Sequence, residues 1–506
     1  MEVHTHCRGV DRWRGNSGRP TSGVSRRAAM NTLRFSIKLR CAHAISAPRP
    51  RKDLRSTPMI KPAATFTHGS LDHHVRVMAF TSGLSLLALF LTDILTLSYV
   101  AMLHDETLVA AVGIAKTLAF FNSSLVAGVI VAAGTLISRR VGQGSRAALP
   151  ALTTHMLVLA ALLSASVSAL QWYCLDFFAS LLGAHAPSSP LARQFIAMTL
   201  VASVLMVLTQ AAAQALRAHG YSGRAMTVVL SSAACLAIVD PVLIFGFDLK
   251  LFGAGVSCLV AGMLGCGVGL YQVKRQVGLM ARVRLRLLWL YGARMARIAL
   301  PFTVANLAMP VALTYTMAQL ALFGVSVMAG MAVMDRVLQL TYCVYFALPG
   351  ALVPILAQNL GAHRSGRSRA ALYSAARLVV LYGLAAWAIL AIASPWLAHA
   401  FGLSGPGQAL IHDLCRFGPG LWIILGLDFI AISVFICRGH VGWVAFYAWL
   451  RATLGTLPFV AAGAALQGAS GVMLGLWVGN ALVALASIVT ALWINRHGTR
   501  TLEVLP

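Results

Sequence analysis

The chain has 506 residues, of which 58% are hydrophobic and only 11% are charged. A soluble domain carries about 25% charged residues, so this composition excludes an ordinary water-soluble protein and indicates a membrane protein. The formal net charge of +26 would also suit a nucleic-acid-binding protein. The position of the basic residues along the chain has to decide between the two classes.

A basic tail occupies residues 1–70. Residues 1–58 hold 13 Lys and Arg against three acids. Such a tail could bind nucleic acid or anionic lipid, or serve as a transit peptide. We favour a disordered leader produced by a start codon upstream of the natural one, with Met30 or Met59 as the true start.

Twelve long apolar runs follow the tail. Each is long enough, at about 1.5 Å per residue of helix, to cross a hydrocarbon core of about 30 Å. The runs are 77–103, 107–137, 150–173, 194–216, 225–246, 253–273, 298–322, 328–357, 370–396, 415–437, 441–465 and 471–495. The sequence therefore predicts an all-α polytopic membrane protein with twelve transmembrane helices, and we expect a monomer.

The loops between the runs differ in charge between the two sides of the membrane. With the N-terminus inside, the six inside segments after the tail carry 18 Lys and Arg, whereas the outside loops carry one, Lys250. Counting Arg193 and Arg416 at the helix edges raises the outside number to three. Because Lys and Arg concentrate on the cytoplasmic side, we expect both termini in the cytoplasm and the chain in the cell inner (plasma) membrane. The positive charge then requires no nucleic-acid partner.

An internal repeat divides the chain in two. The pentapeptide SRAAL occurs at 145–149 and at 368–372, each time after the second run of a set of six. Two more pairs of short stretches recur at similar offsets: RAHG at 217–220 with RGH at 438–440, and GAGV at 253–256 with GASGV at 468–472. Two halves of the same topology are typical of secondary transporters.

The repeat predicts two pseudo-symmetric six-helix lobes joined by a cytoplasmic linker. The predicted parts are an N-lobe at 71–273, the linker at 274–297, a C-lobe at 298–496 and a short cytoplasmic tail at 497–506. Gly142 and Gly361 lie just before the two SRAAL copies, and we interpret them as hinges at helix ends. We interpret Arg146 and Arg369, within the copies, as anchors to anionic lipid.

Several stretches carry a family resemblance between Leu71 and about Arg496. They are THGSLDHHVRVMAF, LTDILTLSYVAMLHDETLVAAVGIA, LRAHGYSGRAM, VDPVLIFGF, ALPFTVANL and VPILAQNLGAHRSGR, in chain order. In this order and spacing the chain resembles the multidrug and toxic compound extrusion (MATE) family. The resemblance implies an antiporter, not an enzyme, that exports organic and often cationic compounds in exchange for H⁺ or Na⁺.

Charged residues inside the apolar runs are the candidate site, because a charge at bilayer depth is costly and usually faces a bundle interior or a cavity. Asp93 and Lys116 stand at similar depth in antiparallel neighbours, so we expect them to pair. The pair is either a static salt bridge or a carboxylate that exchanges Lys116 for a proton. The resemblance implies that Asp93 couples transport to the ion, and we favour that role.

Asp240 precedes Pro241, whose ring disturbs the helix and exposes a polar site. The family pattern resembles N-x-x-x-D-P with a Thr entering the next helix. Here Leu236 replaces the Asn and Cys258 replaces the Thr. Because Na⁺ prefers hard oxygen ligands, the two replacements favour H⁺ as the coupling ion. Some relatives also carry an early proline in the first run, which this chain lacks.

The C-lobe run at 298–322 holds no acid, so the substrate role of a carboxylate there cannot be transferred from the family. Asp428 either binds a cationic substrate or pairs with Arg451. Asp335 and Arg336 are neighbours in sequence, point to different helix faces and are expected to join helices. Polar and aromatic residues that could line the substrate cavity are Phe120, Asn122, Gln210, Gln214, Asn306, Gln339, Tyr342 and Tyr345.

The sequence thus predicts an H⁺-coupled exporter of small organic compounds with no cofactor and no metal site. Nine scattered cysteines form no C-x-x-C pair, and no phosphate-binding G-x-x-x-x-G-K-[ST] stretch is present. Two alternatives stay open. One is a flippase of lipid-linked oligosaccharides, for which Lys116, Arg336 and Arg451 would supply a cationic cavity; the other is Na⁺-coupled drug export.

Overall fold

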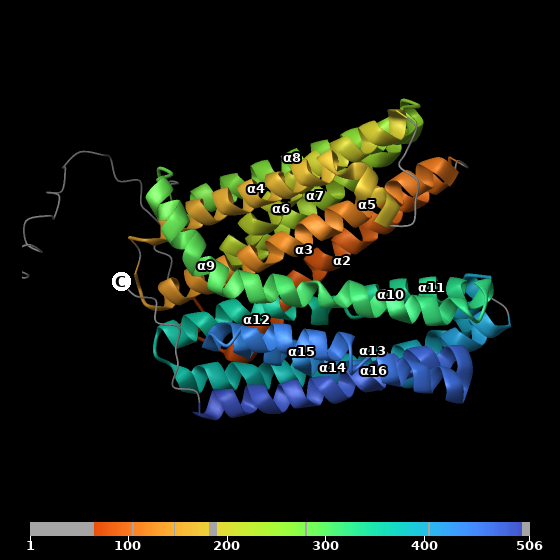
Figure 1. Ribbon diagram of the computed structural model, residues 1–506. Helices are drawn as coiled ribbons and strands as arrows, with labels where there is room; N and C mark the ends of the chain where they lie inside the picture. Colours follow the sequence, from red (N-terminus) through yellow and green to blue (C-terminus); the bar gives the residue numbers. More distant parts are fainter. Residues whose placement is uncertain are drawn as a thin grey trace, which may run out of the picture. The chain divides into compact units, whose positions relative to one another are not determined.

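The computed structural model describes residues 65–103, 106–145, 147–181, 190–278, 281–402 and 405–497. The chain divides into two units, Met1–Met59 and Ile60–Pro506, and all described residues belong to the second. These residues are helical apart from short connections, and no strand occurs among them (Figure 1). The all-α prediction is confirmed.

The N-terminal half contains helices that run nearly the whole length of each predicted span. After a short 3₁₀ turn, η1 (Thr65–Thr67), the elements are α2 (Leu71–Ala101), α3 (Glu106–Gly142), α4 (Leu149–Tyr173), α5 (Leu175–Leu181), α6 (Pro190–Ala218), α7 (Ser222–Pro241), the π-helical turn η2 (Val242–Gly246) and α8 (Lys250–Val277). The π-helical turn directly follows Pro241. A proline lacks the N–H that continues the regular helix, so the chain changes its hydrogen-bonding pattern there.

The C-terminal half repeats this arrangement with more interruptions. Its helices are α9 (Leu285–Asn306), α10 (Ala308–Ala321), α11 (Val325–Thr341), α12 (Cys343–Gly361), α13 (Ser365–Ala400), α14 (Pro406–Arg438), α15 (Gly442–Ala452) and α16 (Leu457–His497). The break between α9 and α10 lies at Leu307. Pro310 explains it, because a proline cannot donate to the carbonyl four residues earlier, that of Asn306.

Eleven helical stretches in the described part are long and apolar enough to cross a membrane. The last of them, Gly442–His497, is 56 residues long, about twice what one crossing needs. The backbone leaves the helix inside it, at Gln467 and at Gly468, where φ is +60°. A left-handed φ of this kind favours glycine. The stretch therefore crosses twice, and the predicted twelve passages are confirmed.

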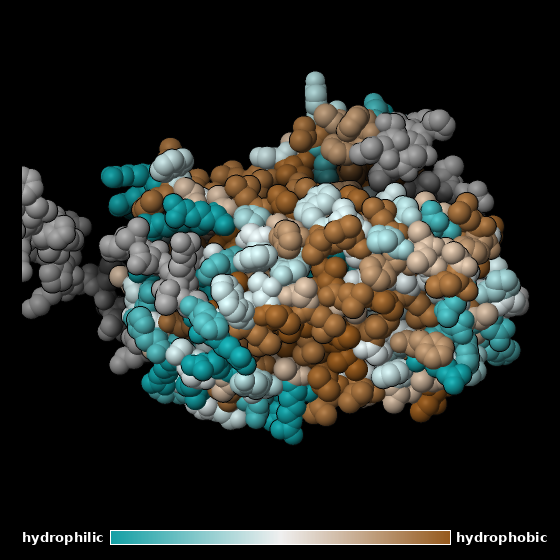
Figure 2. All heavy atoms as spheres, turned by 60° about the horizontal axis from the view of Figure 1, so that its bottom comes forward, coloured by the Kyte–Doolittle hydropathy of each residue, from teal (hydrophilic) through white to brown (hydrophobic). Residues whose placement is uncertain are grey.

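The surface of the spans suits lipid. Figure 2 shows a broad hydrophobic area across the middle of the molecule with hydrophilic groups toward its ends. Large apolar side chains such as Leu300, Ile392 and Val489 are more than half exposed. In water such a surface would mark an interaction site, and here the interaction is with the bilayer.

The segment predicted as the linker, 274–297, is mostly helical. Helix α8 continues to Val277 and α9 begins at Leu285. Two backbone amides between them are held by α4: Ala281 N donates to Thr154 Oγ1 at 3.1 Å, and Arg284 N donates to His155 Nε2 at 3.3 Å. The connection between the halves is thus fixed to the N-terminal half.

Within each half the helices pack mainly on one another, α6 with α8 and α3, and α14 with α16 and α13. The two halves meet where α12 packs against both α2 and α3 and where α9 packs against α3 (Figure 1). Of the predicted N-terminal tail, residues 1–64 lie outside the described residues. Residues 498–506 of the C-terminal tail also lie outside them.

Candidate functional site

An ion pair joins α2 to α3 in the N-terminal half. Lys116 Nζ lies 2.5 Å from Asp93 Oδ1, and the two side chains are 30% and 52% exposed. The predicted pairing is confirmed. Because both side chains keep part of their surface open, neither is sealed in the protein, and the pair can exchange partners without unfolding the helices around it.

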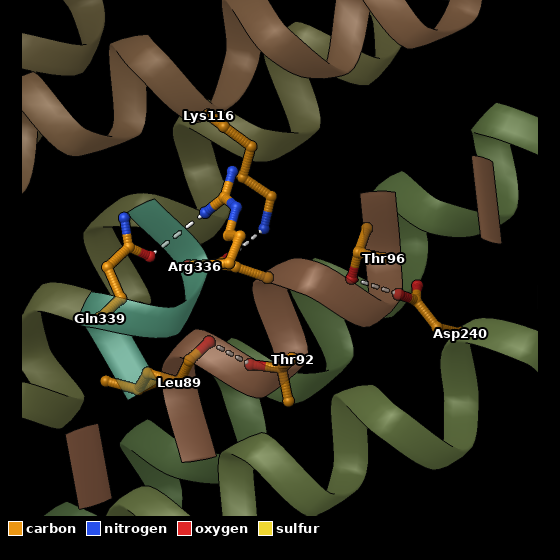
Figure 3. A network of polar contacts seen from close by, with 8 residues as sticks. Leu89, Thr92, Thr96, Lys116, Asp240, Arg336 and Gln339 are labelled. Atoms are coloured by element: carbon orange, nitrogen blue, oxygen red, sulfur yellow. Dashed lines mark hydrogen bonds and ion pairs between the residues drawn. The ribbon is translucent and has the colours of Figure 1, made fainter. Parts of the chain in front are cut away.

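Asp240 lies close to this pair and is far more buried, with 1% of its surface exposed. Thr96, one turn after Asp93 on α2, donates from Oγ1 to Asp240 Oδ2 at 2.6 Å (Figure 3). Lys116 is within electrostatic range of Asp240 as well as of Asp93, and Ser257 of α8 also interacts with the Asp240 carboxylate. The ammonium group of Lys116 therefore pairs with Asp93, and a second carboxylate, that of Asp240, lies nearby. We call Asp93, Thr96, Lys116 and Asp240 the N-lobe cluster.

Thr96 was not among the predicted site residues. A signal was present, because residues three apart lie on the same face of a helix, so Thr96 has to face the same side as Asp93. A threonine in a membrane helix usually bonds to its own backbone, however, and the sequence cannot show that α7 brings Asp240 within reach.

The positions of the two replaced oxygen donors are apolar. Leu236 and Cys258 are 4% and 6% exposed and pack together with Ala202 and Ala261 in one small hydrophobic cluster. The described residues contain no group of three or more His, Cys, Asp or Glu side chains that could hold a metal ion. Leu236 and Cys258 therefore supply no oxygen ligand for a bound Na⁺.

Lys116 belongs to an exposed polar face of α3. Going along the helix, the open or half-open positions include Gly113, Lys116, Thr117, Phe120 and Ser123. Further along the same helix the half-open positions also include the apolar residues Leu125, Val129 and Ile130. The Phe120 ring is 53% exposed and stands one turn from Lys116. An ammonium group and an open aromatic ring thus lie one turn apart on the same face of α3.

Most of the other predicted cavity residues are not on an open surface. Asn122 is fully buried and donates to Ser168 Oγ at 2.7 Å and to Ser203 Oγ at 2.9 Å, so it joins α3 to α4 and α6. Gln214 is 4% exposed, whereas Gln210 is half-buried. Asn306 donates to the Ser124 carbonyl at 3.1 Å and joins α9 to α3.

The two C-lobe tyrosines also have structural contacts. Tyr342 and Tyr345 are fully buried. The Tyr342 ring stacks on Trp422 with centroids 4.8 Å apart, and Tyr345 donates to the Val379 carbonyl at 2.6 Å. Their prediction as cavity lining is wrong for this conformation, because hydropathy alone does not distinguish an aromatic ring in the packed interior from one that lines a cavity.

Asp428 and Arg451 form an ion pair between α14 and α15. The Asp428 side chain is 2% exposed and that of Arg451 25%. Of the two readings of Asp428, the structure shows the pairing. An aspartate that is buried and already neutralised by an arginine is not open to a cationic substrate in this conformation.

Asp335 and Arg336 are linked through a third residue. Gln339 donates to Asp335 Oδ2 at 2.7 Å. It also accepts from Arg336 Nη1 at 3.2 Å (Figure 3). Arg336 is exposed, and its helix, α11, contacts α2, the helix of Asp93. The prediction that the two neighbours do not pair directly is confirmed, and Gln339 binds both.

Gly142 and Gly361 have a different role from the predicted hinge. Each is the last residue of its helix, and neither has a positive φ. A Cβ atom on Gly142 would overlap the Gln358 backbone, and one on Gly361 would overlap the Arg139 backbone. The glycines therefore allow α3 and α12 to touch. Arg369 is exposed, and Arg146 lies outside the described residues.

The comparisons with known proteins agree with this architecture. The MatE family model matches residues 82–242 and 301–457, more than half of the chain and one block in each half. The fold is similar to that of a mutant of the Vibrio cholerae MATE transporter VcmN, with a TM-score of 0.78 and 21% identity over 86% of this chain and 99% of that one.

Two curated proteins are similar in sequence. The FAD transporter of Shewanella oneidensis is 27% identical over 392 residues, which cover 75% of this chain and 85% of that protein. An uncharacterized 21 kDa protein of Pseudomonas savastanoi is 37% identical over 220 residues, 43% of this chain and 72% of that protein. With both halves matched by one family model, the chain belongs to the MATE family of efflux transporters, which are membrane transporters and not enzymes.

Proposed function

We propose that the protein is a secondary antiporter that exports small organic compounds in exchange for H⁺. The observation that carries the proposal is the N-lobe cluster, in which Asp93 pairs with Lys116 while Thr96, one turn further along α2, bonds to the buried Asp240. With both carboxylates ionised the cluster carries one negative charge, and one bound proton makes it neutral. A site of this charge can take up and release a proton as its exposure to the two sides of the membrane changes.

Coupling requires that the proton change the contacts of a moving element, and α2 is suited to this. It holds Asp93 and Thr96, which bond to α3 and α7. The same helix packs against α12 and α13 of the other half. Protonation of either carboxylate weakens a bond that holds α2 on the N-terminal half, and the contacts between the halves then change. Na⁺ coupling is less favoured, because Leu236 and Cys258 supply no oxygen ligand.

Which class of substrate the protein exports depends on which residue of the N-lobe cluster the substrate contacts. An organic cation would contact Asp93 and compete with the proton, which gives exchange in opposite directions. This is the class that the family resemblance favours. The charge balance supports it, since the N-lobe cluster is acidic as long as both carboxylates are ionised.

An aromatic anion is a second candidate, favoured by Lys116 and Phe120 on one exposed face. The Shewanella relative named as a transporter of FAD, which joins aromatic rings to two phosphates, is similar along most of its length. An anion would compete with Asp93 for Lys116 and leave Asp93 free to bind a proton. The linkage then has the opposite sign, because anion and proton bind together.

Three further proposals concern the location of the protein, its oligomeric state and the oligosaccharide alternative. The excess of Lys and Arg in alternate loops supports an inner-membrane protein with both termini in the cytoplasm. We propose that it works as a monomer, because each set of six helices finds its partner within the chain. A lipid-linked oligosaccharide would need a cationic cavity and is less favoured, because Arg451, one of the cations predicted for it, is paired with the buried Asp428.

The test is efflux from proteoliposomes under an imposed pH gradient or an imposed Na⁺ gradient. The probes are a fluorescent organic cation and FAD, for the wild type and for Asp93→Asn and Asp240→Asn. Cation export that is driven by the pH gradient and lost in both variants is the expected result. Export driven only by Na⁺ would overturn the choice of ion. Transport of neither probe would overturn the substrate classes and favour the oligosaccharide alternative.

A further inference from the structure

Thr65–Gly69, which precede Ser70 at the start of α2, are attached to the protein through two buried residues, Phe66 and Thr67. The sequence predicts them as part of the basic tail, yet Phe66 and Thr67 are only 2% and 3% exposed. Phe66 belongs to the main hydrophobic core. Its ring also meets the His74 ring edge-on, with centroids 5.5 Å apart. The last residues of an unstructured leader would not be buried in this way, so Phe66 and Thr67 occupy a specific binding site on the protein.

This binding site is formed by residues of the C-terminal half. Phe66 N donates to Gln358 Oε1 at 3.2 Å, and Asn359 Nδ2 donates to the Phe66 carbonyl at 3.1 Å. Two arginines of the α12–α13 region complete it. Arg364 donates to the Thr67 carbonyl at 2.6 Å, and Arg367 donates to the Gly69 carbonyl at 2.9 Å. Bonds from a charged donor are the stronger kind.

The same five residues also touch the N-terminal half. Gly220, which follows α6 with a φ of +94°, lies so close to Thr65 that a Cβ atom on it would meet the Thr65 hydroxyl. Beneath them Gln358 Nε2 donates to the Ala218 carbonyl of α6 at 2.9 Å. Thr65–Gly69 therefore lies over a joint at which the two halves are hydrogen-bonded directly.

We propose that Thr65–Gly69 is a latch that holds the two halves together at the end of the molecule that carries the SRAAL segments. Its bonds to Gln358 and Asn359 of one half and its close contact with Gly220 of the other can be present together only while the two halves lie close. When the halves separate at this end, the latch must leave at least one of them. Entry of a substrate from this side thus requires release of the latch.

The latch is continuous with the helix that carries the proton site. Helix α2 has no break in its 31 residues. Asp93 is 22 residues after Leu71, so these two residues are about 33 Å apart along the helix. A movement of α2 that follows protonation at Asp93 or Asp240 would strain the hydrogen bonds between Thr65–Gly69 and the C-terminal half. The inference rests on one part of the proposed function, that the two halves move to expose the site first to one side of the membrane and then to the other (alternating access), and it is independent of the coupling ion.

The test measures access to Thr67 in the full-length protein. Thr67→Cys is introduced, and its reaction with a membrane-impermeant maleimide is followed in inside-out vesicles, with the wild type as background for the native cysteines. Labelling is compared with and without the added changes Arg364→Ala and Arg367→Ala. Because these remove two charge-assisted bonds, we expect labelling about tenfold faster. Arg369→Ala is the matched control, an exposed arginine on the same helix for which the structure shows no bond to the latch.

Two results would overturn the latch. One is equal labelling of Thr67→Cys with and without the two arginines. The other is labelling of Thr67→Cys alone as fast as in detergent-unfolded protein. A second measurement uses transport: substrate and an ion gradient together should accelerate labelling, and unchanged labelling during measured efflux would also contradict the proposal. If the wild type shows no efflux at all, the proposed function fails, whereas the contrast between the arginine variants still tests the latch.

Discussion

Gly142 at the end of α3 lies directly against the backbone of Gln358 in α12. The reverse contact is also present, since Gly361 of α12 lies against the backbone of Arg139 in α3. Arg139 and Gln358 are 219 positions apart, as are Gly142 and Gly361. The two contacts are thus related by the internal repeat, and the symmetric crossing of α3 and α12 brings the backbones of the two halves into direct contact.

Substitution of either glycine should weaken this crossing. In Gly142→Ala and Gly361→Ala the added methyl group overlaps backbone, which cannot move aside as a side chain can. We expect each to lower stability by about 1–3 kcal/mol, measured as thermal unfolding in detergent. Gly113→Ala on the same helix has open space around it and serves as the control. Equal stability of the three variants would contradict the contact.

Thr96 should be needed for coupling through its bond to Asp240. Thr96→Val keeps the shape of the side chain and removes the donor, whereas Thr96→Ser keeps the donor. A bond to a charged partner contributes about 1.5–3 kcal/mol, so efflux driven by the pH gradient should fall about tenfold or more in Thr96→Val and recover in Thr96→Ser. The same rate in both variants would show that the bond has no part in transport.

The sign of coupling at Asp93 should reveal the substrate class. Asp93→Asn removes the group for which an organic cation and the proton compete, so cation binding should be lost. For an aromatic anion the same change removes the competitor for Lys116, so binding should become tighter. Equilibrium binding of the two probes to purified protein measures both, and Lys116→Gln should reverse the pattern. A variant that binds both probes as the wild type does would place the substrate elsewhere.

The ion pair between Asp428 and Arg451 should be structural. Arg451→Gln leaves Asp428, 2% exposed, without its countercharge, and removal of one partner of a buried pair costs about 3–5 kcal/mol. The double variant Asp428→Asn with Arg451→Gln removes both charges and should regain most of that stability. Thermal unfolding of the single and double variants measures the difference. A double variant as unstable as the single one would contradict this account.

His219, in the turn after α6, should make stability depend on pH. It is fully buried, and burial lowers its pKa below the ordinary value of about 6.5. As the pH falls below that value the unfolded chain takes up a proton that the folded protein does not, so the free energy of unfolding decreases. Unfolding measured between pH 8 and pH 5 should depend less on pH in His219→Gln. An unchanged slope would contradict the assignment.

The twelve passages could be predicted because crossing a membrane depends on the length and hydropathy of a run, which are local properties of the sequence. The pairing of Asp93 with Lys116 could be predicted for a similar reason, since a short loop makes their helices antiparallel neighbours. Leu236 and Cys258 could also be recognised from sequence as positions without oxygen donors. In each case the decisive contact lies within one helix or between helices that follow each other.

What the tertiary structure decided involves helices far apart in the chain and the direction in which each one faces. Thr96 meets Asp240 across 144 positions, and Phe66 meets Gln358 across 292. Tyr342 was expected in a cavity and is buried against Trp422. Hydropathy determines that a segment enters the membrane, but not how it is rotated or which segment it touches. Those depend on close packing, of which the contact between Gly142 and Gln358 is an example.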